Sequence, residues 1–340
     1  MSEFVETSTE GRLGIIALNR PQAINALSGE MIAAIAETLN AWRDDDAVQV
    51  VLFEGRGPRG FCAGGDVRAV RELVLAGKMD AAQSYFVHEY ALNGQIARYR
   101  KPVVALTHGA VMGGGIGIAG HARFRLTTPE ARFAMPEAAI GFVVDTGVNA
   151  ILARAAEPRA LAFLLSGLTV GAGDALALGL ADCVIDAGRV EAVRTGIIAA
   201  ADAADIETAL VSLMQAESVE GGAPEVCEAA DLRAEAFTAT SVAGILAALG
   251  DDAVLGQVIA GRSPTSLDAI LSSHRAARRA RQVEEVLALD LRFAHYMIAQ
   301  PDFVEGVRAV LVDKDQKPRW QPARGAEVDR AAIEKLINPL

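Results

Sequence analysis

The sequence predicts an α/β fold, because segments typical of β-strands alternate with segments typical of helices along its first half. Three apolar runs of strand length carry this prediction, and each is followed by turn residues or glycine. They are Leu13–Leu18, Val48–Phe53 and Val103–Leu106. From about Asp231 onward, helical periodicity dominates, which predicts an added helical region after the α/β part.

The other expected elements follow in chain order. Ser28 is typical of a helix N-cap, and the helix after it has apolar residues at helical spacing: Met31, Ile32, Ile35, Leu39 and Trp42. The stretch 157–180 predicts two short helices, and a strand is expected near Cys183–Ile185. The clearest helix is predicted over Gln282–Gln300.

Composition and charge exclude several classes of protein. Hydrophobic residues make up 51% and charged residues 22% of 340 residues, which is a composition that folds around a core rather than staying disordered. The net charge of −11 argues against a general nucleic-acid binder, which needs a positive surface.

The sequence further predicts a protein of the cytoplasm that does not enter a membrane. Three widely spaced cysteines, Cys62, Cys183 and Cys227, indicate reduced thiols, and the acidic N-terminus resembles neither a secretory signal nor a transit peptide. The longest uncharged stretch, Pro102–Gly120, is rich in glycine and is interpreted as a buried strand, a turn and a small-residue helix.

One motif suggests a nicotinamide oxidoreductase. Gly115–Gly120 satisfies G-x-G-x-x-G after a predicted strand, and Glu137 lies at about the spacing of a ribose ligand. The motif alone is weak, because glycines also permit close helix packing. A metal site is not expected, because the histidines lack ligand spacing.

A basic cluster lies at His274–Arg281. It is interpreted as a solvated helix face, with contact to phosphates as the alternative.

Two glycine turns and two carboxylates remain as candidate chemistry. The turns Phe61–Asp66 and Met112–Gly115 each follow a predicted strand and open a helix, so each can present an unpaired backbone N–H. Two such donors that converge form an oxyanion hole, although such turns are also common as purely structural features. Glu137 and Asp145 lie among apolar residues, which raises the pKa of a carboxyl and makes both candidates for acid, base or nucleophile.

The two turns, together with Ala17–Pro21 before them and Phe133–Glu137 after them, resemble the crotonase (enoyl-CoA hydratase/isomerase) superfamily. The resemblance implies a spiral of ββα units, an acyl-CoA substrate and no other cofactor. It also implies that the backbone N–H groups of Gly65 and Gly114 hold the thioester oxygen. Family members commonly build trimers, so a homo-oligomer is expected.

Within the superfamily, the chain is similar to the 3-hydroxyisobutyryl-CoA hydrolases. Hydratases have two catalytic glutamates; the second matches Glu137, whereas the first falls on Gly117. Asp145 stands where these hydrolases have aspartate and hydratases have glycine, and Glu89 matches an acidic residue that the hydrolases place near the substrate. The chain departs from the subfamily in having Val144 before this aspartate and no glycine run after it.

The C-terminal third resembles the same subfamily in Ser263–Leu267 and Glu305–Asp315, and simple hydratases lack this extension. The resemblance therefore implies a crotonase core over residues 1–195 and a helical region over 196–340.

The implied activity is hydrolysis of a short β-hydroxyacyl-CoA, with 3-hydroxyisobutyryl-CoA as the leading substrate and valine breakdown as the pathway. Glu137 would attack or activate water, Asp145 would orient water or the substrate hydroxyl, and Glu89 would contact that hydroxyl. An enoyl-CoA hydratase or isomerase and a non-catalytic acyl-CoA-binding protein are the alternatives. CoA is anionic, so an acidic protein needs a local cationic patch, for which the arginines of 275–281 are the first candidates.

Overall fold

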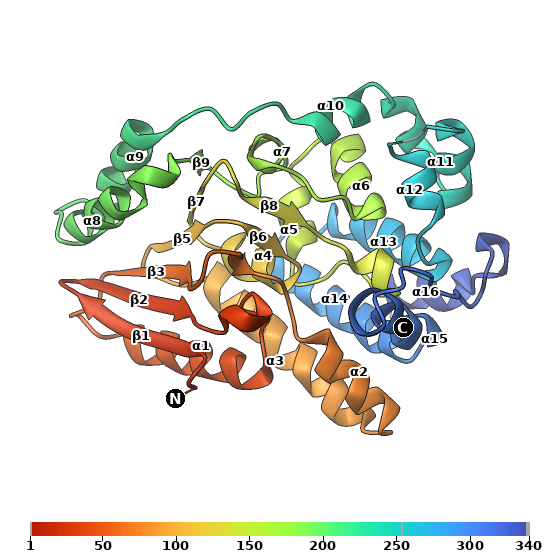
Figure 1. Ribbon diagram of the computed structural model, residues 1–340, viewed down its shortest axis with the longest axis horizontal. Helices are drawn as coiled ribbons and strands as arrows, with labels where there is room; N and C mark the ends of the chain where they lie inside the picture. The colour runs from red at the N-terminus through yellow and green to blue at the C-terminus, as the bar shows by residue number, and fades with distance from the viewer. Residues whose placement is uncertain (1, 253, 338–340) are drawn as a thin grey trace. The chain divides into compact units, whose positions relative to one another are not determined.

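The computed structural model describes residues 2–252 and 254–337. The chain divides into two compact units, each assembled from three separate stretches of sequence (Figure 1). The first unit contains Met1–Gly65, Ala91–Phe133 and Val170–Pro224; the second contains Asp66–Tyr90, Ala134–Thr169 and Glu225–Leu340. A domain boundary at residue 195 stays a prediction. No helix in the described part of the chain combines the length and the apolar composition that crossing a bilayer requires.

A six-stranded sheet in the order β1-β2-β3-β5-β7-β9 is the centre of the first unit. The β1–β2 pair is antiparallel and the other four pairs are parallel. The strands are β1 (Val5–Glu10), β2 (Leu13–Leu18), β3 (Val50–Gly55), β5 (Val103–Thr107), β7 (Phe124–Thr127) and β9 (Cys183–Val184). The predicted strands are confirmed, with β3 starting two residues later than expected. Because the strand order never reverses, the sheet lacks the switch point at which dinucleotide-binding folds hold their ligand.

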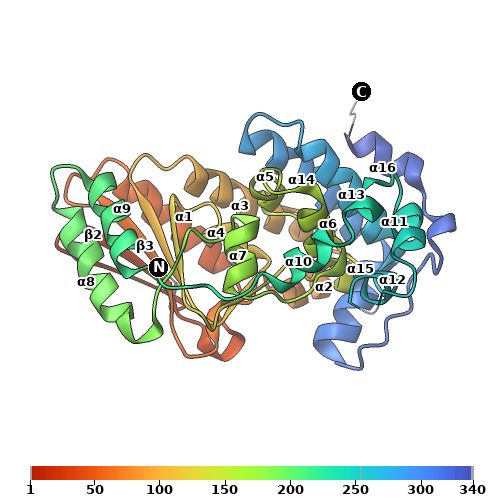
Figure 2. The ribbon, with the colours of Figure 1, turned by 90° about the horizontal axis from the view of Figure 1, so that it is seen from above.

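Both faces of this sheet are covered. On one face, alternate strand residues such as Ile15, Leu52 and Val104 form a core with helices α8 (Val190–Ala201) and α9 (Ile206–Glu217), which lie side by side (Figure 2). Helix α1 (Gly29–Trp42) covers the other face, where a Cβ at Gly14 would lie 2.7 Å from the Trp42 ring. Ser28 caps α1 as predicted, accepting a hydrogen bond from the Met31 N–H. Coverage on both faces explains why every residue of β2 is apolar or glycine and buried.

A second sheet of three strands, in the order β4-β6-β8, gives the fold its repeat. Its strands are β4 (Gly60–Cys62), β6 (Ala110–Met112) and β8 (Arg132–Ala134). Each follows a strand of the large sheet within a few residues, so that β3–β4, β5–β6 and β7–β8 are successive pairs. Helix α2 (Val67–Leu75) comes after the first pair and α4 (Gly114–Ala119) after the second. The predicted spiral of ββα units is therefore confirmed.

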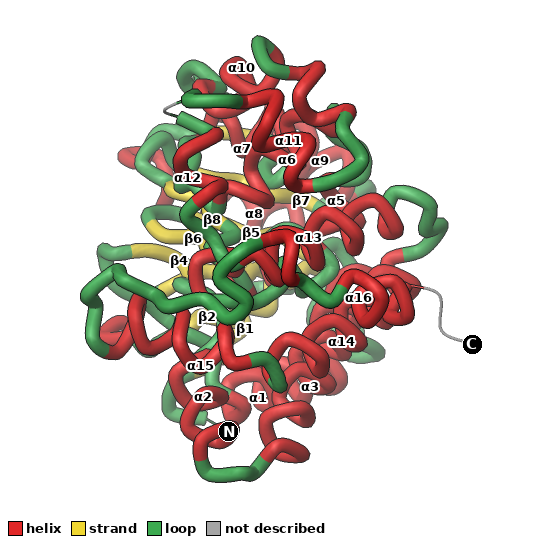
Figure 3. The backbone as a smooth tube through the Cα atoms, turned by 90° about the vertical axis from the view of Figure 1, so that its right-hand side faces the viewer, coloured by secondary structure: helices red, strands yellow, loops and turns green. Residues whose placement is uncertain are grey.

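The second unit is built mainly from helices. Besides the elements already given, the two units contain the following helices: η1 (Pro21–Ala23), α3 (Met79–Ala97), η2 (Glu137–Ile140), α5 (Val148–Leu152), α6 (Glu157–Ser166), α7 (Ala172–Leu178), η3 (Ala187–Arg189), α10 (Glu225–Asp231), η4 (Ala234–Thr238), α11 (Val242–Leu249), α12 (Gly256–Ala260), α13 (Pro264–Ala277), α14 (Val283–Ile298), α15 (Pro301–Val307), the π-helix η5 (Arg308–Val312), η6 (Gly325–Glu327) and α16 (Arg330–Ile337). In the second unit α13, α14 and α16 pack together (Figure 3). Every described element after α10 is helical, as the periodicity predicts.

The loop after β2 is fixed by one buried asparagine. The Asn25 side chain accepts a hydrogen bond from the Arg20 N–H at 2.8 Å and donates to the carbonyls of Gly60 and Phe61 at 3.3 and 3.0 Å. Asn25 also has a φ of +55°, in the left-handed region that asparagine tolerates better than most residues. This side chain therefore ties the loop to the strand that precedes the first glycine turn.

Replacing Asn25 with alanine should lower the free energy of unfolding by about 2–3 kcal/mol, because buried backbone groups lose their partners. Urea unfolding followed by circular dichroism measures the loss. Asn40→Ala is the matched control, since Asn40 is exposed on α1 and its loss should cost less than about 0.5 kcal/mol. Equal losses for the two variants would contradict this role of Asn25.

Candidate active site

The two predicted glycine turns lie against each other in the first unit. Gly64 has a φ of +105°, and a Cβ there would lie 3.1 Å from the Met112 carbonyl oxygen and 3.5 Å from the Gly114 nitrogen. Only glycine allows this approach, since any side chain would meet both the strain of the positive φ and the neighbouring backbone. The structure therefore brings together the turns that carry Gly65 and Gly114.

Each turn opens a helix, as predicted. Asp66 caps α2 by accepting a hydrogen bond from the Ala69 N–H. Gly113 is the N-cap of α4, with a φ of +47°, and makes no side-chain cap, so Gly114 starts the helix. The first N–H groups of a helix have no acceptor within it, and the helix dipole makes them favourable for an anion. The Gly114 N–H is therefore a suitable donor to an oxyanion.

The G-x-G-x-x-G motif lies in and at the end of helix α4, and its first glycine has a packing role. Gly115 and Gly117 lie buried inside α4, and a Cβ at Gly115 would lie 2.6 Å from the Cys62 carbonyl oxygen. This contact brings α4 close to β4, the strand before the first turn. The interpretation of this motif as a dinucleotide site is wrong, because Gly115 and Gly117 lie inside α4, Gly115 packs against β4, and the large sheet has no switch point.

The predicted carboxylates cluster in the second unit. Glu89 lies on α3, Glu137 begins η2 and Asp145 lies in the turn before α5, and their exposed fractions are 2%, 6% and 4%. The Tyr90 hydroxyl donates a hydrogen bond to Oδ2 of Asp145. Asp145 interacts electrostatically with both glutamates. The expectation that Glu137 and Asp145 avoid a solvated face is confirmed.

Burial sets the protonation of this cluster. It raises the pKa of Glu89 and of Glu137 well above the usual range, and the charge of Asp145 raises both further. Burial also raises the pKa of Asp145, to about 7, although the hydrogen bond from Tyr90 lowers it. Asp145 thus acts as a charged neighbour of the two glutamates, and both glutamates are more easily protonated than an ordinary glutamate.

A fourth buried carboxylate, Asp290, belongs to the same region and was not predicted. It lies on α14 and its Oδ2 accepts a hydrogen bond from the Gly147 N–H at 2.8 Å. Burial raises its pKa well above the usual range, and the charge of Asp145 adds to the effect. A signal did exist in the sequence, since Asp290 interrupts the apolar stripe formed by Leu287, Ala294 and Met297.

Asp290 supports a turn of unusual backbone geometry. Thr146 and Gly147 have φ values of +58° and +74°, and the Thr146 hydroxyl donates to the Asp145 carbonyl at 2.7 Å. These residues form the segment in which the chain departs from the pattern of the subfamily that it resembles. The Asp290 contact holds Gly147, two residues after Asp145, and the Tyr90 hydroxyl holds the Asp145 side chain itself.

Several polar atoms of the cluster have no partner within the described residues. They are Oε1 of Glu89, Oε2 of Glu137 and Oδ1 of Asp290. Buried polar atoms are nearly always hydrogen-bonded, so unpaired ones grouped together indicate a place for a ligand or water. In the same part of the chain, no group of three His, Cys, Asp or Glu side chains is arranged to hold a metal ion.

The basic cluster is partly structural. Arg275 pairs with Glu157 at 3.0 Å and donates to the carbonyls of Phe237 and Ala239 at 3.1 and 2.8 Å. His274 is buried against Asn149, at 3.0 Å between Nδ1 and Oδ1. Arg278, Arg279 and Arg281 are exposed. A solvated face therefore describes only the end of this cluster, and a contact with CoA phosphates there stays a prediction.

The chain is similar to known proteins over nearly its whole length. A profile of the family described as enoyl-CoA hydratase/isomerase matches residues 13–337. A relative from Danio rerio, named 3-hydroxyisobutyryl-CoA hydrolase, mitochondrial, is 35% identical over 97% of this chain and 88% of its own length. The Homo sapiens protein of the same name is 34% identical over 100% of this chain and 89% of its own.

Two solved structures are similar over nearly the whole chain. A protein from Mycobacterium thermoresistibile described as a carnitinyl-CoA dehydratase has a TM-score of 0.90 and 36% identity, and covers 100% of this chain and 97% of its own. A protein from Rhodobacter sphaeroides 2.4.1 described as an enoyl-CoA hydratase has a TM-score of 0.87 and 31% identity, with coverage of 99% and 98%.

The successive ββα units and the adjoining glycine turns define a crotonase fold. The chain belongs to the enoyl-CoA hydratase/isomerase family.

Removing the Asp145 charge should stabilise the protein at neutral and higher pH. Its folded pKa of about 7 exceeds the ordinary value of 3.8, so its contribution to stability is full below about pH 3.8 and is lost as the pH rises through 7. Asp145→Asn should therefore raise the free energy of unfolding at pH 8 by on the order of 1 kcal/mol or more. Urea unfolding at a series of pH values from about 4 to 8 measures the change.

The exposed Asp251 provides the control for this series, since Asp251→Asn changes the formal charge equally. The gain expected for Asp145→Asn should grow with pH, while the control should follow the wild type. A variant at position 145 that is less stable than wild type at pH 8 would show that the Asp145 carboxylate is well compensated in the fold.

Proposed function

We propose that this chain hydrolyses the thioester of a short β-hydroxyacyl-CoA, with 3-hydroxyisobutyryl-CoA as the leading substrate. The observation that carries the proposal is the buried pair of Asp145 and Glu137, next to Glu89 and held by Tyr90. Curated relatives over nearly the full length are named 3-hydroxyisobutyryl-CoA hydrolases, which supports this substrate.

The glycine turns would supply electrostatic stabilisation of the reaction. The N–H groups of Gly65 and Gly114 would donate hydrogen bonds to the thioester oxygen as it gains negative charge. Each preorganised donor of this kind contributes on the order of 10²–10³ in rate. The adjoining turns of the first unit support this role, since Gly64 approaches the Gly114 nitrogen closely.

Glu137 would carry the nucleophilic chemistry. It either attacks the carbonyl carbon directly or takes a proton from the water that does so. In the water route, Glu137 takes a proton from water, the new carbon–oxygen bond forms, the carbon–sulfur bond breaks, and Glu137 gives the proton to the leaving sulfur. In the direct route, the acyl group is first transferred to Glu137 as the thiolate leaves. Water then cleaves this acyl-enzyme, which regenerates Glu137, releases the acid and supplies the proton that the thiolate takes up. A raised pKa makes Glu137 a stronger base than an ordinary glutamate when it is ionised, and a ready proton donor afterwards.

Glu89 and Asp145 would position the reactants. A protonated Glu89 can donate a hydrogen bond to the substrate hydroxyl, and its Oε1 has no other partner among the described residues. Burial and the charge of Asp145 raise the pKa of Glu89, and Asp145 is itself held by the Tyr90 hydroxyl, so Asp145 is the better acceptor for a water or a hydroxyl. Together they would select an acyl group that carries a polar β-substituent.

A second candidate, addition of water to or removal of water from a CoA ester, is favoured by the descriptions of both similar solved structures. The Mycobacterium thermoresistibile protein described as a carnitinyl-CoA dehydratase is 36% identical to this chain. Hydratases of the superfamily use two glutamates, however, and the first of these positions is Gly117, buried within α4. With no carboxylate there, α4 cannot supply half of the acid–base pair.

A parallel assay separates these functions. We would mix the protein with 3-hydroxyisobutyryl-CoA and with crotonyl-CoA, and follow free thiol and enoyl absorbance in each. Thiol release from the first substrate is expected, and Glu137→Gln should lower kcat by about 10²–10⁴-fold because a catalytic base or nucleophile is lost. Glu235→Gln, an exposed exchange of the same kind, should leave the rate unchanged.

Other outcomes identify the alternatives. Enoyl loss without thiol release would establish a hydratase. If neither thiol release nor enoyl loss is detected, while CoA esters still raise the melting temperature of the protein, the protein would be established as a binding protein without catalysis. Thiol release that persists in Asp145→Gly, which introduces the hydratase residue, would remove Asp145 from the mechanism.

Further features of the protein are also proposed. CoA is part of the substrate, and no further cofactor is proposed. A homo-oligomer built from trimers is proposed by resemblance to the family. Valine breakdown is the pathway that the leading substrate implies. A cytoplasmic location is proposed from the sequence, whereas the named vertebrate relatives are mitochondrial proteins.

A further inference from the structure

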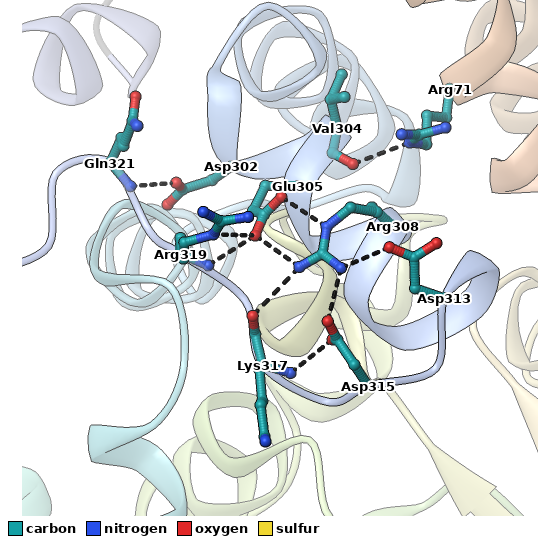
Figure 4. Close-up of polar contacts among 10 residues, drawn as sticks. All are labelled: Arg71, Asp302, Val304, Glu305, Arg308, Asp313, Asp315, Lys317, Arg319 and Gln321. Atoms are coloured by element: carbon teal, nitrogen blue, oxygen red, sulfur yellow. Dashed lines mark hydrogen bonds and ion pairs between the residues drawn. The ribbon is translucent and has the colours of Figure 1, made fainter.

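The C-terminal region contains a strap, defined as residues 313–321, that is held along α15 by charged side chains (Figure 4). Arg308 is central to it. Its guanidinium donates to Glu305 on one side at 2.9 and 2.8 Å, and to Asp313 and Asp315 on the other at 2.7 and 2.8 Å. It also donates to the Lys317 carbonyl at 3.2 Å. These contacts fold the chain back after the π-helix η5.

The strap also binds α15 through its backbone. The Arg319 N–H donates to Glu305 at 2.9 Å, and the Gln321 N–H donates to Oδ1 of Asp302 at 2.6 Å. Glu305 and Asp302 both lie on α15, so the strap and the helix form one body. Arg71 adds a contact from α2, donating to the Val304 carbonyl at 2.9 Å.

Asp302 connects this body to two other segments. Its Oδ2 accepts a hydrogen bond from the Ser263 hydroxyl at 2.6 Å, and Ser263 is the N-cap of α13. The Ser263 N–H in turn donates to the Ala138 carbonyl at 3.2 Å. Ala138 directly follows Glu137 in η2. A fully buried carboxylate thus joins the strap, α13 and the segment that carries Glu137.

Backbone packing strengthens the same connection. Gly141, with a φ of +69°, lies so close to the Asp302 carbonyl that a Cβ would overlap it, and Gly306 meets the Ile140 backbone in the same way. The Phe142 and Phe303 rings lie 5.6 Å apart between centroids. The residues that follow Glu137 are therefore packed directly onto α15.

We propose that Asp302 is a positioning residue for Glu137, acting through the Ser263–Ala138 contact and the packing of α15 on Gly141. This inference rests on the proposed function of Glu137. A four-residue 3₁₀ segment such as η2 does not hold its own geometry, since short helices are marginal without tertiary contacts. Catalysis is sensitive to displacement, because a shift of about 1 Å can cost about 10²-fold in rate.

The experiment compares Asp302→Ala with Asp268→Ala. Asp268 is also buried and paired, with Arg330 at 2.8 Å, but it anchors α16 rather than α15. Asp302→Ala should lower kcat for thiol release by about 10–100-fold with KM changed less than about twofold. Asp268→Ala should leave both within about twofold. Asp302→Asn keeps the shape and the acceptor for Gln321, and should recover most of the rate.

A second readout does not depend on catalysis. The Phe142 N–H donates to the Glu137 carbonyl at 2.9 Å, so its hydrogen exchange reports the order of η2. Asp302→Ala should speed this exchange at least about tenfold relative to Asp268→Ala. If Asp302→Ala does not fold, Ser263→Ala, which removes only the hydroxyl, should show the same changes to a smaller extent.

The outcomes separate the two proposals. An inactive wild type with the expected exchange pattern would overturn the proposed function and leave the coupling of Asp302 to η2 established. An active wild type in which Asp302→Ala or Ser263→Ala behaves as Asp268→Ala does, in kcat and in exchange, would overturn the positioning role.

Discussion

The burial of several carboxylates around Asp145 is the constraint on which much of the structure of the second unit depends. Acidic groups placed together away from water resist ionisation, because each charge loses solvation and repels the next. Tyr90 offsets part of this cost through its hydrogen bond to Asp145, and Asp290 accepts the Gly147 N–H behind the same turn. A chain would not retain such an arrangement for stability, since apolar residues would pack there at lower cost.

The C-terminal region stabilises the segments that carry the buried carboxylates. A short 3₁₀ segment and a turn with two positive φ values carry Glu137 and Asp145, and neither is stable alone. Helix α14 holds the turn through Asp290, while α15 holds the 3₁₀ segment through Asp302 and the glycine contacts. The helices added after the ββα repeats thus supply the rigidity that catalytic carboxylates require.

The sequence predicts the local features well and the distant contacts poorly. The β-strands, the Ser28 cap and the two glycine turns follow from apolar periodicity and from glycine spacing, which are local properties. The pairings of Asp290 and Asp302 were missed because their partners, Gly147 and Ser263, lie 143 and 39 residues away in sequence. The local pattern shows only that Asp290 interrupts an apolar stripe, not what it pairs with. Arg275 looked like a surface charge because nothing nearby in the sequence indicates its pairing with Glu157. The crotonase resemblance, by contrast, identified Glu89 as a candidate site residue. The periodicity of the helix that contains Glu89 does not indicate such a role.

The balance of carboxylates also bears on which bond the site would break. Adding water across a carbon–carbon double bond needs a group on each side of the reacting atoms, one to activate water and one to protonate carbon. Thioester hydrolysis needs a stabilised oxyanion and a single group that acts first as base or nucleophile and then as acid, because the sulfur leaves from the carbon that water attacks. Gly117 leaves α4 without an acidic side chain, whereas Asp145 and Glu89 add carboxyls next to Glu137. Such a distribution suits hydrolysis at one carbonyl with a polar substituent nearby. It suits less well the addition of water across two carbons.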